Sequence, residues 1–300
     1  MPALRSAVKA GVERILVALH NAGLARGPGS AQLVLAYHNI VPRGQPAVGD
    51  LSLHLPQDVF SAQLDLLTEH ADVVSLERLL AGPNGGLRPR VAITWDDAYQ
   101  GAVTVGVEEL RRRNLPGTMF VAPGCLDGFA FWWDALADPA RGLAGEVRTA
   151  ALEEGAGLTT RVRAMAAAHG WTWREMPSYA RTATEAEVRD AAGNGLTLGA
   201  HTWNHPNLTR LTPDERRDEL LRPLAWLGAA GLPSLAYPYG LWNPAVAREA
   251  ADAGYRAGFL IDGGWWAGTR EDGFKIPRLN VPAGLSRDGF TLRLYGRFAR

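Results

Sequence analysis

Four short polar segments each follow an apolar run of the length expected for a buried strand. These segments are residues 37–39 (YHN), 96–97 (DD), 201–205 (HTWNH) and 237–240 (YPYG). Parallel α/β folds place their active sites at the carboxyl ends of strands, where such segments would lie close together. Imidazole and carboxylate groups can bind a metal ion or transfer protons, so we expect a single site built from these segments.

His201 and His205 stand four residues apart. This spacing lets both imidazoles reach one metal ion if the loop coils by one turn, although HxxxH also arises by chance. The pair lacks the glutamate of the HExxH pattern, which excludes that class of zinc peptidase. Cys125 is the only cysteine, so a cysteine-rich zinc site is excluded as well. Together with one aspartate, the two histidines would form a site suited to Zn²⁺ or a similar divalent ion.

Asp96 and Asp97 are neighbours at the end of a predicted strand. Neighbouring side chains of a strand point to opposite faces, so both carboxylates can reach one site only where the strand ends and the backbone turns. The alternative is that one aspartate merely caps the next helix. Because the pair follows a buried run, we favour the functional interpretation.

The elements that must position these residues alternate between strands and helices. Predicted strands cover residues 33–38, 91–97, 118–122, 196–201, 234–238, 255–261 and 274–281, and a helix is predicted over 57–70. Such alternation indicates a parallel α/β sheet or barrel. Further helix starts are predicted at Thr184 and Thr212, each followed three residues later by glutamate, and at Asn243 before a proline. Residues 125–183 do not follow this alternation of strands and helices and are predicted to be a helical insertion.

Composition excludes some classes of partner. The chain has 300 residues, 31 basic and 31 acidic side chains, and a pI near 7.1, so nucleic acid is not expected as a partner. No window approaches the ~18 apolar residues of a membrane span, and residues 1–27 lack the uncharged core of a signal peptide. We therefore expect a cytoplasmic protein.

Residues 1–30 are predicted to form an amphipathic helix and a linker. Apolar residues recur at helical spacing at Leu4, Val8, Val12, Ile15, Leu16 and Leu19. We expect this face to pack against the rest of the chain or a partner chain. Peripheral contact with a membrane surface is the alternative.

The polar segments, in their order, resemble the motifs of a known family. Residues 94–97 (TWDD), 116–121 (PGTMFV), 201–205 (HTWNH) and 237–240 (YPYG) are similar to those of the polysaccharide deacetylases, the NodB-homology or carbohydrate esterase 4 group. Residues 33–40 (LVLAYHNI) and 275–281 (KIPRLNV) resemble its circularly permuted branch, which includes deacetylases of poly-N-acetylglucosamine. The resemblance spans about residues 33–282 outside the insertion. It implies a distorted parallel (β/α) barrel of about seven strands in a catalytic domain over residues 31–300.

The resemblance also implies an activity, the removal of N-acetyl groups from an acetylated amino sugar or glycan with a divalent metal, zinc first and cobalt or nickel otherwise. Asp97, His201 and His205 would bind the metal, and Asp96 would be the general base. The backbone N–H of Tyr239 would stabilise the oxyanion. His38 would protonate the leaving amine.

Ala236 departs from the family pattern, because many relatives have an arginine there that pairs with the base. Arg278 on the last predicted strand is a candidate replacement, with an ordinary salt bridge as the equal alternative. If no cation replaces that arginine, the chain could be a non-catalytic glycan-binding module. A metal-dependent amidase or esterase for a small acetylated substrate is a further alternative.

Four residues are expected to contact substrate. Tyr237 and Pro238 belong to the same motif as Tyr239. Trp132 and Trp133 are candidates for an aromatic platform under a sugar ring, with burial in the core as the alternative.

Overall fold

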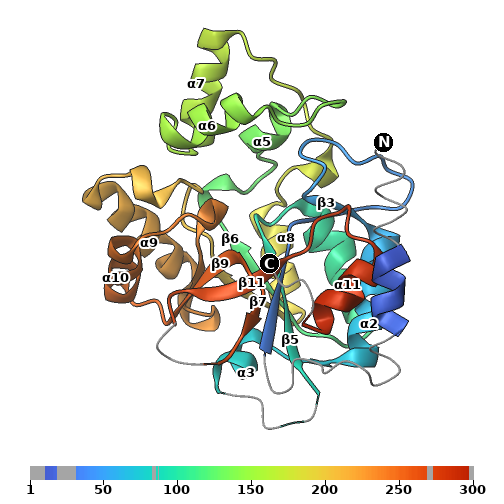
Figure 1. Ribbon diagram of the computed structural model, residues 1–300. Helices are drawn as coiled ribbons and strands as arrows, with labels where there is room; N and C mark the ends of the chain where they lie inside the picture. The colour runs from blue at the N-terminus through green and yellow to red at the C-terminus, as the bar shows by residue number, and fades with distance from the viewer. Residues whose placement is uncertain (1–10, 19–31, 83–85, 87, 269–272, 297–300) are drawn as a thin grey trace.

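Seven parallel strands form a closed barrel in the computed structural model, which describes residues 11–18, 32–82, 86, 88–268 and 273–296 (Figure 1). In chain order they are β1 (Gln32–Tyr37), β5 (Arg90–Asp96), β6 (Gly117–Val121), β7 (Leu196–Ala200), β8 (Ser234–Ala236), β9 (Ala257–Gly263) and β11 (Ile276–Asn280). Around the barrel the order is β1-β11-β9-β8-β7-β6-β5, and six residue pairs between β1 and β5 close it. The predicted barrel is confirmed.

Short strands extend the barrel at two places. β4 (Asp72–Val73) adds to β5 in parallel, and β10 (Trp265–Trp266) adds to β1 in the antiparallel sense. A separate parallel pair joins β2 (Asn39–Val41) to β3 (His54–Pro56). Because β2 begins one residue after His38, this pair fixes the chain that leaves the end of β1.

Helices surround the barrel. They are α2 (Gln57–His70), α3 (Leu76–Leu80), α4 (Val107–Arg111), α8 (Glu185–Gly193), α9 (Pro213–Leu227), α10 (Pro244–Ala253) and α11 (Arg287–Leu294). The helix predicted over residues 57–70 has these bounds. Thr184 and Thr212 each begin a helix with a complete capping box, and the Asn243 side chain accepts hydrogen bonds from the first turn of α10. The predicted helix starts are therefore confirmed.

The segment between β6 and α8 contains the helices α5 (Trp132–Ala135), α6 (Gly145–Glu153) and α7 (Thr159–His169). They form the lobe at the top of Figure 1. This segment leaves the barrel at the carboxyl end of β6, so it lies at the end of the barrel that carries the polar segments.

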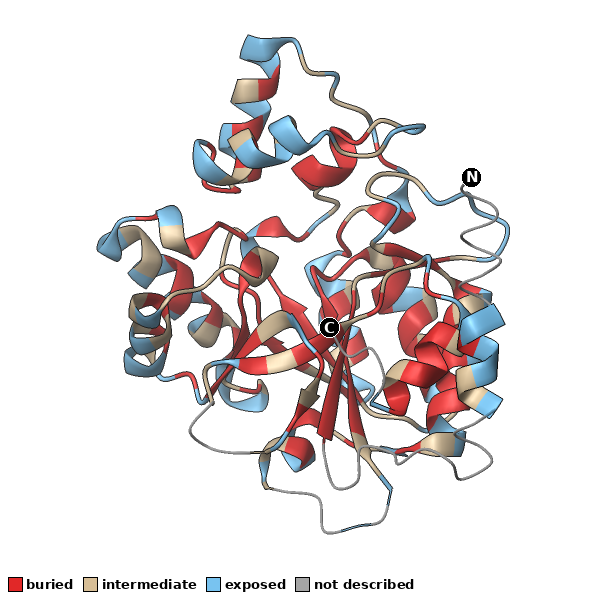
Figure 2. Cartoon of the chain, viewed as in Figure 1, coloured by how far each residue is buried: buried red, intermediate tan, exposed pale blue. Residues whose placement is uncertain are grey.

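The barrel interior is filled in layers by side chains that alternate along each strand. One layer is apolar and includes Val34, Ala92, Phe120, Phe259 and Ile276. Two positions further along, β5 carries Thr94 and then Asp96, and β11 carries Arg278. β1, β6 and β8 are buried along their whole length, and β5 is buried except at its first residue (Figure 2). The polar layer is therefore enclosed at one end of an apolar interior.

Of the predicted N-terminal helix and linker, only residues 11–18 are described, and they are helical; Leu4, Val8 and Leu19 lie outside the described residues. Val12 and Ile15 are 48% and 63% exposed, so of the two expected packing partners for this face, the rest of the described chain does not cover these two side chains. Glu13 is buried instead and accepts a 2.6 Å hydrogen bond from Ser286, the residue that caps α11. Among the described residues, no helix is both long and apolar enough to cross a bilayer.

Candidate metal centre

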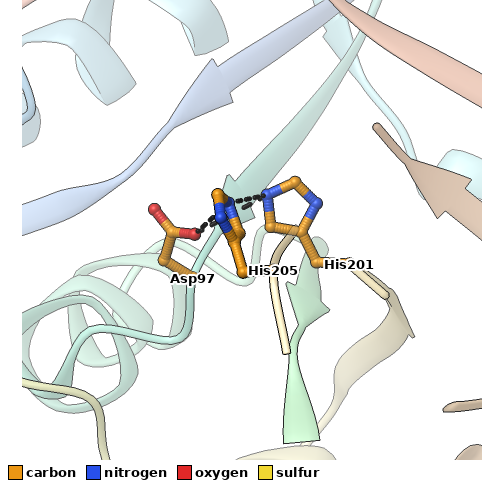
Figure 3. Close-up of side chains that lie close together, drawn as sticks. All are labelled: Asp97, His201 and His205. Atoms are coloured by element: carbon orange, nitrogen blue, oxygen red, sulfur yellow. Dashed lines mark hydrogen bonds and ion pairs between the residues drawn. The ribbon is translucent and has the colours of Figure 1, made fainter. Parts of the chain in front are cut away.

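Asp97, His201 and His205 converge at the carboxyl ends of β5 and β7 (Figure 3). His205 Nε2 lies 3.0 Å from His201 Nε2 and 3.2 Å from Asp97 Oδ1, and His201 Nε2 lies 3.6 Å from the same oxygen. All three side chains are buried. Three ligand atoms this close around one point match the demands of a divalent cation with open positions for water and substrate.

The protonation of the two histidines suits metal binding. Burial lowers the pKa of His201, against the opposing effect of Asp96, and it lowers the pKa of His205 to about 3. Both imidazoles are therefore neutral near pH 7, the form that binds metal ions. His201 Nδ1 lies 2.8 Å from the carbonyl oxygen of Ala236 and can only donate to it, which leaves the lone pair of Nε2 facing the centre.

Among the described residues, no arginine or lysine pairs with the carboxyl group of Asp97, which faces the two histidines. Burial raises its pKa to about 6, although His201 and His38 act in the opposite direction. Its Oδ1 is buried and accepts no hydrogen bond from the part of the chain that the structure describes. A divalent cation at this point would pair with that oxygen and favour the ionised form. The three side chains thus fit a metal ion by charge, protonation and spacing.

Backbone turns bring both aspartates to the same site. Asp97 and Ala98 have φ values of 72° and 51°, in the left-handed region that side chains with a Cβ rarely adopt. The regular alternation of β5 ends there, so Asp96 points into the barrel while Asp97 faces the histidines. His205 and Thr202 are also left-handed, at 56° and 64°. Each such residue costs about 1–2 kcal/mol, which the surrounding structure must offset.

Asp96 forms a buried ion pair with Arg278. The guanidinium donates to both carboxylate oxygens, at 2.7 and 2.6 Å, and the Arg278 side chain is fully buried. Burial alone would raise the pKa of Asp96, but the charge and hydrogen bonds of Arg278 hold it well below its usual range. Arg278 therefore places a cation opposite Asp96 from β11, although position 236 on β8 holds an alanine.

Asp96, Asp97, His201 and His205 all line one cavity of about 180 Å³. His38, which follows the end of β1, lines it together with Tyr239. Burial lowers the pKa of His38, and the carboxylates of Asp97 and Asp96 counteract this effect. An imidazole that faces two carboxylates at the cavity wall is placed to transfer a proton to a bound molecule.

Tyr239 is in the left-handed region with φ 59°, and its ring lies 4.6 Å from that of His205, centre to centre. Its hydroxyl donates to the carbonyl oxygen of Gly157 at 2.8 Å, so the insertion fixes this residue. Tyr237 lines the cavity, but its hydroxyl donates to Phe274 O at 3.1 Å. Pro238 is buried and does not line the cavity. Tyr237 and Tyr239 can therefore contact a bound substrate directly, whereas Pro238 cannot.

The two tryptophans occupy different positions. Trp133 lines the cavity and packs 4.9 Å from the His205 ring, centre to centre. Trp132 is fully buried, and its indole donates to Tyr239 and Gly157. A sugar ring cannot stack on Trp132, which corrects the expectation for this residue, because its faces are enclosed between the insertion and Tyr239.

Glu219 on α9 is a functional candidate that the sequence did not indicate. Its carboxylate accepts hydrogen bonds from the backbone N–H groups of Trp203 and Asn204 at 2.9 and 2.7 Å, and from the Asn204 side chain at 2.7 Å. It thereby holds the loop between the two histidines. Nothing in a lone glutamate on an amphipathic helix signals this role.

We expect Glu219→Gln to weaken zinc binding by about 10- to 100-fold, because an amide offers one acceptor oxygen in place of two and the loop loosens. Calorimetric titration of metal-free protein with zinc measures this affinity. Glu215→Gln, on the same helix but at the surface, is the control and should leave zinc affinity unchanged. Unchanged affinity in Glu219→Gln would show that the loop holds its shape without that carboxylate.

Comparison with known proteins identifies the family. The sequence model described as "Polysaccharide deacetylase" matches residues 84–258, more than half of the chain. The chain belongs to the polysaccharide deacetylase family. The Bacillus subtilis (strain 168) protein YxkH, whose name assigns it to the same family, is 26% identical over 111 residues, which cover 36% of this chain and 39% of YxkH. The chain thus spans well under half the length of this relative.

Solved structures show the same fold. The Streptococcus pyogenes deacetylase PplD, in complex with acetate, matches with a TM-score of 0.60 and 19% identity, covering 89% of this chain and 99% of PplD. IcaB from Ammonifex degensii matches with a TM-score of 0.59 and 16% identity, covering 90% of this chain and 98% of IcaB. At these identities the likeness shows that this chain shares its fold with PplD and IcaB.

Proposed function

We propose that this polysaccharide deacetylase family member is a metal-dependent hydrolase that removes N-acetyl groups from an acetylated amino sugar within a glycan. The observation that carries the proposal is the convergence of Asp97, His201 and His205 next to the Asp96–Arg278 ion pair in one cavity. The family supports a deacetylase, and PplD in its acetate complex supports acetate as the released product.

Zinc, with cobalt or nickel as alternatives, suits the three ligands. Such an ion would supply Lewis-acid chemistry at the acetyl group and at water. The chain itself would hold the acetylated nitrogen between Asp96 and His38, both of which line the cavity. Reacting groups held in this way gain rate from orientation alone.

Asp96 is the candidate general base that accepts a proton from the attacking water. Arg278 keeps it ionised and fixes the plane of its carboxylate by two hydrogen bonds. A base that is preoriented and ionised needs no rearrangement before it accepts the proton.

His38 is the candidate acid, and the Tyr239 backbone is the candidate stabiliser of the oxyanion. Protonation by His38 lets the nitrogen leave as a neutral amine, since an amide anion is a poor leaving group. The backbone N–H of Tyr239 would donate to the negatively charged oxygen of the tetrahedral intermediate. Substrate contact by Tyr237 and Trp133 would position the sugar beside these groups.

The test is acetate release from N-acetylglucosamine oligomers. We expect release by the purified protein, its abolition by a chelator, and its recovery when zinc, cobalt or nickel is added back. His201→Ala should lose zinc binding and reduce acetate release to background, because two of three ligands do not hold the ion. Chelator-resistant release would refute metal dependence, and oligomer binding without release under any metal would favour the non-catalytic glycan-binding module.

A further inference from the structure

A second buried polar network lies beside the cavity and is centred on Asp134 of α5. The Asp134 side chain is fully buried. Its Oδ2 accepts a 2.5 Å hydrogen bond from the Tyr99 hydroxyl, and its Oδ1 lies 2.9 Å from His54 Nε2. His54 Nδ1 accepts from the Asn39 amide at 2.9 Å, so Nε2 carries the proton and donates to Asp134.

This network reaches one wall of the cavity through Tyr99. The Trp133 indole donates to the Tyr99 hydroxyl at 2.9 Å, while that hydroxyl donates to Asp134. Trp133 lines the cavity and also stacks on Phe131, with ring centres 4.3 Å apart. The orientation of its indole is therefore set by a hydrogen-bond chain that ends at Asp134.

The same carboxylate reaches a second part of the cavity wall through residues 49–53. Asp134 Oδ1 accepts a 2.9 Å hydrogen bond from the backbone N–H of Asp50. Gly49 has φ +77° and lies so close that a Cβ there would collide with the Asp134 carboxylate. Asp50, Ser52 and Leu53 line the cavity. One side chain of the insertion thus holds a loop that precedes β3 and a tryptophan of α5.

We propose that Asp134 is a positioning residue that sets the distance between these two walls and thereby the affinity for the sugar that carries the acetyl group. The inference rests on the proposed function. It adds that the insertion determines glycan binding through this carboxylate, separately from the metal centre. Asp134 does not line the cavity, so it acts only through Trp133 and residues 50–53.

The experiment compares two substrates in wild type, Asp134→Asn and Tyr99→Phe, all loaded with zinc. An N-acetylglucosamine pentamer needs both walls, whereas a small acetylated aryl substrate needs only the reacting groups. We expect kcat/KM for the pentamer to fall about 10- to 100-fold in Asp134→Asn, mainly through KM, because small displacements of binding groups carry costs of this order. The aryl substrate should change less than about threefold, and zinc affinity should be unchanged. Tyr99→Phe should show a smaller change of the same kind, since it releases only Trp133.

Glu109→Gln is the matched control. Glu109 is also buried and hydrogen-bonded, to Gln57 and Arg113, but it does not line the cavity. It should leave the ratio of the two kcat/KM values unchanged. An equal fall on both substrates, or a loss of zinc affinity, would overturn the proposal, because either result indicates a general structural role. If Asp134→Asn does not fold, the two kcat/KM values and the zinc affinity of Tyr99→Phe test the proposal in its place.

Pentamer binding by calorimetry separates this inference from the proposed function. If wild type releases no acetate from either substrate, the proposed function fails. Weaker pentamer binding by Asp134→Asn than by wild type would still support the positioning role, and equal binding would overturn it.

Discussion

Replacing Asp96 by asparagine is expected to lower the rate of acetate release by about 10²- to 10⁴-fold while the protein still binds zinc. Asparagine preserves the shape of the side chain but cannot accept a proton from water near neutral pH. The three candidate ligands are Asp97, His201 and His205, so their geometry should persist. Acetate assays and zinc titrations on the same protein preparation measure the two effects.

Asp97→Asn serves as the neighbouring comparison. It should lose both zinc affinity and turnover, because the carboxylate beside the two imidazoles is removed. A fully active Asp96→Asn variant would refute the role of base. Loss of zinc affinity in Asp96→Asn would instead indicate that Asp96 is a metal ligand, since its Oδ2 lies 3.9 Å from His201 Nε2.

The sequence predicted the barrel because local patterns and global fold agree. Apolar runs mark the seven strands, and caps such as Thr212 mark the helix starts. Strand ends were accurate to a few residues, as β5 ends at Asp96 and the prediction ended at Asp97. The packing of the N-terminal helix was harder to predict, because an amphipathic pattern does not specify which partner covers the apolar face. Glu13 is buried instead, and its carboxylate accepts a hydrogen bond from Ser286.

The sequence also grouped the metal-centre residues, since they all follow strands of one parallel barrel. It left the function of Arg278 open, because contact between β11 and β5 depends on closure of the barrel and on the register of two non-consecutive strands. In the closed barrel, Arg278 and Asp96 both point inward and meet. The contributions of Glu219 and Asp134 could not be predicted, because each depends on a loop of irregular conformation.

Removal of the Arg278 guanidinium is the second change with a large expected effect. Arg278→Met should lower the free energy of unfolding by about 3–5 kcal/mol, because it leaves the Asp96 carboxylate buried without its cation. Activity should fall as well, since burial then raises the pKa of Asp96 and the base is protonated over more of the pH range. Urea unfolding of metal-free protein and acetate release across pH measure the two effects.

The pH dependence of stability gives an independent check. In wild type the pKa of Asp96 is lowered by Arg278, so its contribution is present above the unfolded pKa, about 3.9, and is lost as pH falls through the lower folded value. In Arg278→Met the folded pKa lies above the unfolded one. Asp96 then destabilises the folded state as pH rises above about 4, so the deficit relative to wild type should grow between pH 4 and pH 7.

Arg216→Met is the matched control for Arg278→Met. Arg216 also donates to both oxygens of a carboxylate, Glu249, at 2.6 and 2.7 Å, but Glu249 is 32% exposed and can be hydrated when its partner is removed. Its loss should cost about 1 kcal/mol and leave activity unchanged. In the double variant Asp96→Asn with Arg278→Met, neither charge remains buried, so the loss of stability should be smaller than the sum of the two single losses. Additive losses would mean that the two side chains contribute independently and that Arg278 does not serve Asp96.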